Sequence, residues 1–186
     1  MPIISSMLWR RVNAPGHDAC RLEQGIDRWK LEGAATFRHE NGPANISYSV
    51  QCNVDWQTLS GRIRGFVGQR SVHYTVVRSG GLWTLNDAPV PSLRHLLDLD
   101  LGFTPATNLQ QLRRVSIAAN ETVHLPVAWL DVDAGTLSEL PQIYERRGEA
   151  AFWYQAPSFG YEGLLELAPN GFIRSYPGLW EAEVTT

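Results

Sequence analysis

Two acidic residues lie two positions apart in the segment Asp98-Leu-Asp-Leu101, which reads as a short strand. Side chains at such positions lie on the same face of a strand, so both carboxylates would point the same way. A carboxylate pair of this kind can carry acid–base chemistry or bind a hard cation. Acidic residues at the start of a loop more often only cap the backbone and face water, and this simpler interpretation is favoured.

A pair of arginines, Arg113 and Arg114, follows fifteen positions after Asp98 and is expected to open a strand. Neighbouring side chains of a strand point to opposite faces, so one guanidinium would face the protein interior and the other the solvent. A buried arginine needs an anionic or hydrogen-bonding partner. We expect this partner to be Asp98 or Asp100, and the alternative is an anionic or hydroxyl group of a ligand.

Aromatic residues are abundant on the faces that are predicted to be apolar. Packing of the core accounts for most of them, but Tyr and Trp also line sugar and lipid pockets, because each combines an apolar ring with a polar group. These residues are Trp29, Tyr48, Trp56, Tyr74, Trp129, Tyr144, Trp153 and Tyr154.

Other kinds of chemistry find little support. The five histidines show no metal-binding spacing, the two cysteines form no CxxC motif, and no metal or cofactor is expected. The sequence has no GxSxG motif and no glycine-rich phosphate loop, so no catalytic residue is assigned. A net charge of −3 argues against a general nucleic-acid binder.

The elements that would position these groups are strands. From Asn45 to Val54 polar and apolar residues alternate without a fault, which predicts a strand with one wet and one dry face. Similar alternation and closely spaced turn signals recur along most of the chain, as in an all-β protein. The exception lies near residues 104–112, where Thr104 and Pro105 predict the start of a short helix.

The chain of 186 residues is expected to form a single β domain, residues 1–186. The fold class is all-β and mainly antiparallel: a strongly curved sheet or open β-barrel with a short helical insert. No stretch is long and apolar enough to span a membrane, and the N-terminal segment does not resemble a signal peptide. A cytoplasmic location follows as an expectation, with Cys20 and Cys52 as buried free thiols and one disulfide as the alternative.

The segment from Asp98 to Arg114 resembles the most distinctive segment of a family of bacterial proteins named putative glycolipid-binding. In that family a short acidic strand leads into Thr-Pro-x-Thr-Asn and then a paired arginine. Val54-Asp-Trp56, Tyr144-Glu-Arg146 and the segment from Gly171 to Leu179 resemble its other signatures, so the likeness covers essentially the whole chain. Leu109-Gln-Gln-Leu112 departs from the family pattern, which affects the expected geometry of the helical turn.

The resemblance implies a strongly curved antiparallel fold, similar to the bacterial lipoprotein carriers LolA and LolB. It implies no catalytic role, and a likeness of fold does not establish a function. Those carriers are exported, whereas this chain shows no export signal. The resemblance and the residue analysis together give these candidate ligand-binding residues: Asp98, Asp100, Thr104, Asn108, Arg113, Arg114, Tyr144, Trp56 and Tyr154.

Our leading hypothesis is non-catalytic binding of an amphiphilic ligand, a glycolipid or a fatty acyl compound, in the concavity of the sheet. One alternative is a small-molecule hydrolase or isomerase that uses the region of Asp98, Asp100, Arg113 and Arg114. Another alternative is an interaction scaffold with a solid core. The interior should discriminate between them: an apolar cavity of roughly 300 Å³ or more favours a ligand, and a strongly perturbed carboxyl group in it favours an enzyme.

Overall fold

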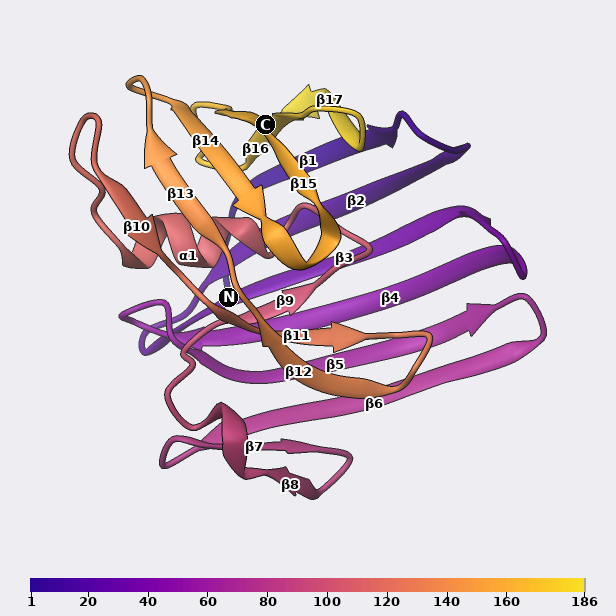
Figure 1. Ribbon diagram of the computed structural model, residues 1–186. Coiled ribbons are helices and arrows are strands. Elements are labelled where there is room, and N and C mark those ends of the chain that lie inside the picture. Colours follow the sequence, from indigo (N-terminus) through magenta and orange to yellow (C-terminus); the bar gives the residue numbers. More distant parts are fainter. Residues whose placement is uncertain (186) are drawn as a thin grey trace.

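The computed structural model describes residues 1–185, which form 17 strands, one α-helix and two short 3-10 helices (Figure 1). The strands are β1 (Ile3–Arg11), β2 (Gly16–Gln24), β3 (Arg28–His39), β4 (Gly42–Asn53), β5 (Thr58–Val67), β6 (Arg70–Ser79), β7 (Leu82–Leu85), β8 (Ala88–Val90), β9 (Leu99–Leu101), β10 (Thr122–His124), β11 (Val127–Asp131), β12 (Thr136–Leu140), β13 (Ile143–Arg146), β14 (Ala151–Ala156), β15 (Tyr161–Leu167), β16 (Ile173–Tyr176) and β17 (Trp180–Thr185). The helices are η1 (Pro91–Leu93), α1 (Asn108–Arg114) and η2 (Pro157–Phe159).

Fourteen strands form one continuous sheet in the order β10-β13-β14-β15-β16-β17-β1-β2-β3-β4-β5-β6-β7-β8. The first and last strands of the chain, β1 and β17, are neighbours in its middle. Within the described part of the chain the end strands β8 and β10 do not pair with each other, so the sheet is open. The prediction of a strongly curved, mainly antiparallel sheet is therefore confirmed, and the barrel is not closed.

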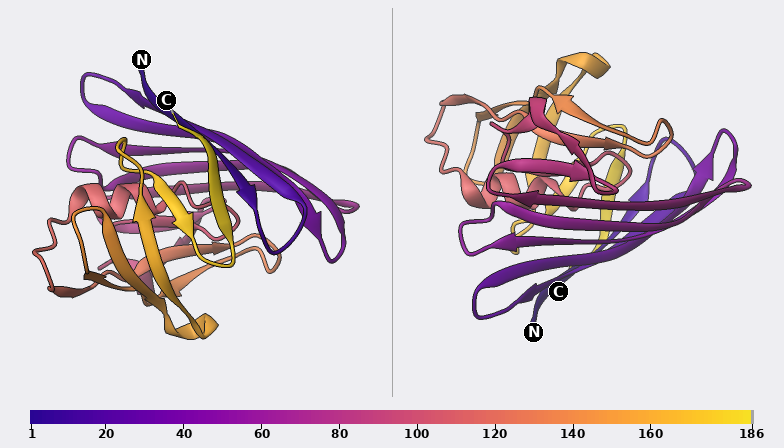
Figure 2. Two further views of the ribbon diagram at one scale, coloured as in Figure 1. Left: turned by 90° about the horizontal axis from the view of Figure 1, so that it is seen from above. Right: turned by 90° about the horizontal axis from the view of Figure 1, so that it is seen from below.

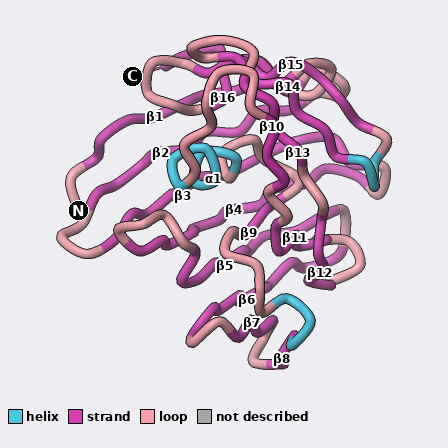
Figure 3. The backbone as a smooth tube through the Cα atoms, turned by 60° about the vertical axis from the view of Figure 1, so that its left-hand side comes forward, coloured by secondary structure: helices cyan, strands magenta, loops and turns pink. Residues whose placement is uncertain are grey.

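A smaller sheet has the order β12-β11-β9, and here β9 and β11 run parallel. Figure 2 shows the long strands β1–β6 as one curved layer, with α1, the small sheet and strands β13–β16 lying against it. Colouring by secondary structure shows how little of the backbone is helical (Figure 3). Side chains from both layers meet between them, and this is where the functional groups gather.

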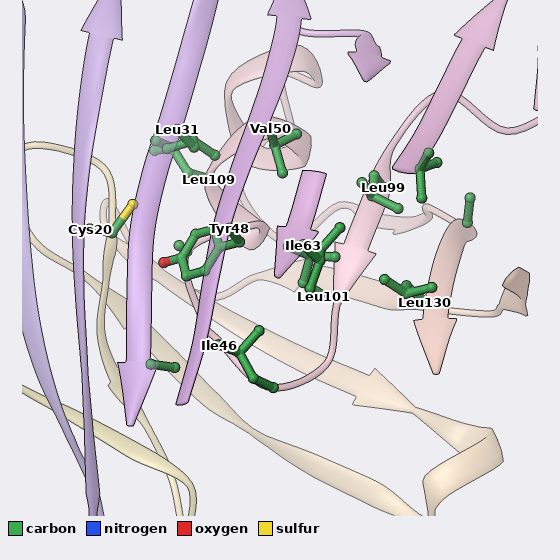
Figure 4. Close-up of a cluster of buried hydrophobic side chains, with 14 of the residues drawn as sticks. Cys20, Leu31, Ile46, Tyr48, Val50, Ile63, Leu99, Leu101, Leu109 and Leu130 are labelled. Carbon is green, nitrogen blue, oxygen red and sulfur yellow. The ribbon is translucent and has the colours of Figure 1, made fainter. Parts of the chain in front are cut away.

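Strand β4 shows how the sequence pattern produces the core. Its side chains alternate between buried and more exposed, and Ile46, Tyr48 and Val50 all belong to the main hydrophobic cluster (Figure 4). The predicted alternation continued to Val54, but β4 ends at Asn53 and Val54 is 57% exposed. Asn53 Oδ1 accepts hydrogen bonds from the backbone N–H groups of Asp55 and Gln57, which turns the chain before Val54 can face the core.

The helical insert lies a few residues later than predicted. Helix α1 starts at Asn108 instead of near Thr104, and it continues to Arg114, where we expected a strand. The Thr104 hydroxyl does not cap the helix, because it bonds to Asp18 and accepts from the backbone N–H of Ala106. The arginines are therefore successive residues on a helix, about 100° apart around its axis, and not on opposite faces of a strand.

Candidate functional site

A cavity of about 490 Å³ lies between the curved sheet and the layer that covers it. Most of its wall is apolar or aromatic, and the covering layer supplies much of it. The walls include Phe37, Ile46, Val67, Phe103, Trp129, Leu130, Val132, Leu140, Ala156, Phe159, Leu179 and Trp180. Phe159 is 56% exposed and marks the opening to the surface. A cavity of this size and lining is typical of small-molecule sites.

Four buried polar residues also line this cavity, and we call them the polar floor: Asp100, Thr104, Asn108 and Tyr154. All four were candidate ligand-binding residues from the sequence. Each is at most 7% exposed. The polar floor offers a carboxylate, an amide and two hydroxyl groups to any molecule that enters.

Asp100 is held in place by strand pairing and by one hydrogen bond. It lies on β9 opposite Trp129 of the parallel strand β11, and its Oδ2 accepts from Gln142 Nε2 at 2.6 Å. Burial raises the pKa of Asp100 to about 6, and the hydrogen bond from Gln142 opposes this rise. The expectation that acids here would mostly face water was wrong, because β9 is covered on both sides.

Asp98 does not line the cavity but anchors the helix. Its carboxylate is completely buried and forms an ion pair with Arg114, with Arg114 Nη2 at 2.5 Å from Asp98 Oδ2. Burial raises the pKa of Asp98, and Arg114 opposes the rise. Arg113 is exposed and donates to the backbone oxygen of Asn170. The predicted asymmetric pair is thus present, with Asp98 as the partner of the inward arginine.

The buried face of α1 carries amide side chains that form hydrogen bonds to Tyr144 of β13. Asn108 Nδ2 donates to the Tyr144 hydroxyl at 2.9 Å, and that hydroxyl donates to Gln111 Oε1 at 2.7 Å. The Tyr144 ring lies 4.9 Å from the ring of Tyr154. Tyr144, a candidate ligand contact, is fully buried beneath the cavity and supports two residues that line it.

A third buried carboxylate, Asp18, lies next to Thr104. Asp18 is completely buried and receives hydrogen bonds from the Thr104 hydroxyl and, at 2.9 Å, from the Tyr48 hydroxyl. Burial raises the pKa of Asp18 to about 6, and the two hydroxyl groups oppose the rise. The sequence analysis missed Asp18, although it shares the dry face of β2 with Cys20 and Leu22 and the period of two could have revealed it.

Four charged residues of the cavity lining are more exposed than the polar floor, and we call them the rim: Arg11, His39, Asp131 and Asp133. Asp133 on the turn between β11 and β12 contacts His39 Nε2 at 3.0 Å and Arg70 Nη2 at 2.8 Å. These contacts tie the covering hairpin to strands β3 and β6. No rim residue was proposed from the sequence, because the strand pattern gives no sign of where an opening lies.

Five candidate residues do not line the cavity: Asp98, Arg113, Arg114, Tyr144 and Trp56. Trp56 lies in the turn before β5 with a φ of 64°, and its ring stacks on Trp29 at 4.5 Å. Trp56 therefore contributes to core packing away from the polar floor. The described residues contain no group of three or more His, Cys, Asp or Glu that could hold a metal ion. Among them, no helix is long and apolar enough to cross a membrane.

The fold and the cavity define a class: curved, open antiparallel β proteins that enclose a pocket with a polar floor. Residues 6–182 match a protein family described as "putative glycolipid-binding", and the chain belongs to this family. The prediction of family membership from the sequence is confirmed. A search of curated proteins found no match.

The crystal structure of a DUF1089 family protein from Pseudomonas aeruginosa has a similar fold. The TM-score is 0.78 over 89% of this chain and 91% of that one, at 20% sequence identity. Identity this low supports the fold alone. The expected likeness to the LolA and LolB carriers stays a prediction.

Proposed function

We propose that this protein binds an amphiphilic small molecule, a glycolipid or a fatty acyl compound, in the cavity of about 490 Å³ without transforming it. The cavity itself carries the proposal: it combines long apolar walls with a buried polar floor. An acyl chain would contact Ile46, Val67 and Leu130, and burial of its methylene groups would drive binding. The description of the family supports the same class of ligand.

The polar floor suits a hydroxyl-bearing group. Asp100 can accept hydrogen bonds, Asn108 can donate and accept, and Tyr154 can do both. Aromatic walls such as Trp129 and Tyr161 can contact the apolar face of a sugar ring. The cavity disfavours the solid-core scaffold, since a solid core leaves no space of this size between its layers. A cytoplasmic location stays an expectation from the sequence.

An acid–base enzyme is the second candidate, and Asp100 is the observation that favours it. A buried carboxyl group with a pKa raised to about 6 can exchange a proton near neutral pH. The version that used all of Asp98, Asp100, Arg113 and Arg114 loses support, since only Asp100 of these lines the cavity. Asp98 is already neutralised by Arg114, and Arg113 faces solvent.

Native mass spectrometry of gently purified protein tests the binding proposal directly. We expect a co-purified adduct with the mass of a lipid, lost on denaturation and recovered by organic extraction. Ala156→Phe should fill the cavity and remove the adduct, because Ala156 is buried in its wall. Gln155→Phe is the matched control, since it adds a ring on the other face of β14, beside Glu162.

An adduct that survives Ala156→Phe in a folded protein would contradict binding in this cavity. The enzyme candidate makes a different prediction about the extracted compound. Incubation with fresh wild-type protein should convert it to a product of different mass or retention time, whereas Asp100→Asn should not. A compound that returns unchanged from wild-type protein supports simple binding.

A further inference from the structure

Arg11 lines the cavity and forms no ion pair with any carboxylate of the described residues. The other basic residue of the lining, His39, contacts Asp133. Arg11 is the last residue of β1 and shares the inward face of that strand with Met7 and Trp9, which are buried. Strand β1 lies between β17 and β2, and Arg11 at its end lines the cavity. A positive charge on the inward face of a strand needs an explanation.

Two aromatic rings and one amide fix the Arg11 side chain. Its guanidinium carbon lies 4.8 Å from the ring centre of Phe37 and 5.7 Å from that of Trp180. Its Nε donates to Asn13 Oδ1 at 2.8 Å. On β2 the residue before His17, the partner of Arg10, is Gly16, which pairs with Phe37, so no side chain at Gly16 separates the guanidinium from the ring. Cation–π contacts of this kind hold a guanidinium in one orientation.

The two terminal amino groups of Arg11 have no hydrogen-bond acceptor among the residues described, and no carboxylate lies within ion-pair distance. By contrast, the arginines Arg10, Arg70 and Arg114 each contact a carboxylate. The guanidinium of Arg11 is partly removed from water, and this burial lowers its pKa, while its terminal donors stay unused. A fixed fork of two free N–H groups matches the geometry of a carboxylate or phosphoryl group.

The acidic residues of the rim do not cancel this charge. Asp133 contacts both Arg70 and His39, and Asp131 Oδ1 accepts from the backbone N–H groups of Asp133 and Ala134. Asp100 is buried in the polar floor and bonded to Gln142. The acidic groups that line the cavity are therefore engaged elsewhere, and Arg11 is left for a ligand.

We infer that Arg11 is an anion anchor: the cavity ligand carries a carboxylate or phosphoryl group that accepts hydrogen bonds from the two terminal amino groups of Arg11. The inference rests on the proposed function and narrows it, from amphiphiles in general to anionic ones. The acyl chain would extend from the rim along the apolar wall. Free fatty acids and phosphate-bearing lipids share this chemistry.

The test compares ligands that share one acyl chain but differ in head group. Dodecanoate, dodecyl phosphate, 1-dodecanol and dodecyl glucoside are titrated into the protein. The change in tryptophan fluorescence reports binding, because two of the seven tryptophans, Trp129 and Trp180, lie in the cavity wall. We expect one of the two anions to bind at least about tenfold more tightly than the alcohol and the glucoside, since hydrogen bonds to charged groups are the stronger ones. A preference for dodecanoate identifies a carboxylate, and a preference for dodecyl phosphate a phosphoryl group.

Arg11→Gln should remove the preference for the anion and leave the affinity for 1-dodecanol unchanged. Arg10→Gln is the matched control, because Arg10 faces the other side of the same strand and pairs with Glu183. If wild-type protein binds the alcohol or the glucoside as tightly as the anions, the anchor is refuted and the cavity proposal stands. If Arg11→Gln keeps the anion preference while folded, the anchor is likewise refuted. If none of the four compounds binds, the proposed function fails as well.

Discussion

Arg114 and Asp98 form an ion pair that joins the end of α1 to the residue just before β9, with Nη2 and Oδ2 2.5 Å apart. The Asp98 side chain is completely buried, and that of Arg114 is 19% exposed. The pair fixes the helix whose first residue, Asn108, lies in the polar floor. Loss of either partner would therefore affect both stability and the shape of the cavity.

Arg114→Ala should lower the free energy of unfolding by about 3–5 kcal/mol, because the buried carboxylate of Asp98 is left without its partner. Arg113→Ala should cost less than about 1 kcal/mol, because Arg113 is exposed and makes one hydrogen bond to a backbone oxygen. Urea unfolding of both variants measures the difference. The single domain expected from the sequence predicts one cooperative transition. Equal losses in the two variants would show that the ion pair does not stabilise the helix.

Asp100 should make the free energy of unfolding fall as the pH rises, because its carboxyl group is buried and its pKa is raised. Its pKa is raised from 3.8 to about 6 in the folded state, so between these values the folded protein binds more protons than the unfolded one. Its contribution to the free energy of unfolding is therefore present at low pH and is lost as the pH rises to about 6. The free energy of unfolding of Asp100→Asn, relative to that of wild type, should therefore rise by up to about 3 kcal/mol between pH 4 and pH 7.

Urea unfolding of wild type and Asp100→Asn at pH 4 and pH 7 tests this prediction. The comparison between the two proteins cancels the titration of the other carboxyl groups, including Asp18, whose pKa is raised by the same cause. A difference between the two proteins that does not change with pH would contradict a raised pKa at Asp100.

Tyr144→Phe should destabilise the protein by about 1–3 kcal/mol, because the lost hydroxyl leaves the buried amides of Asn108 and Gln111 without a partner. Tyr74→Phe is the control. It removes a hydroxyl that donates to the backbone oxygen of Val132 in a half-buried place, where water can replace it. Thermal unfolding of both variants compares them, and a larger loss for Tyr74→Phe would refute the role of Tyr144.

Both cysteines should be unreactive until the protein unfolds. Cys20 and Cys52 are free and buried, and burial raises the pKa of each thiol, to about 12 for Cys52. Thiolate, the reactive form, is therefore scarce at pH 8. A disulfide-exchange reagent should modify neither thiol in the native protein and both in guanidinium chloride. Rapid modification of the native protein would show that the core around Cys52 opens readily.

The local pattern predicted the strands well and their ends less well. Strand β4 follows the alternation read from the sequence, because a period of two is a property of each strand alone. The predicted strand at Arg113 is instead the end of a helix. Short segments do not decide between the two, and here the ion pair of Arg114 with Asp98 and the packing of Leu109 favour the helix.

The sequence by itself determined the all-β class and the family, and it named all four residues of the polar floor as candidates. Three of them, Asp100, Thr104 and Asn108, lie in the most distinctive segment of the chain. Only the tertiary structure decided which side chains share a space. Arg11 and Phe37 lie on different strands, and Asp18 and Thr104 are 86 positions apart. Strand order, register and curvature bring such residues together, and these depend on the whole sheet, which no local pattern encodes.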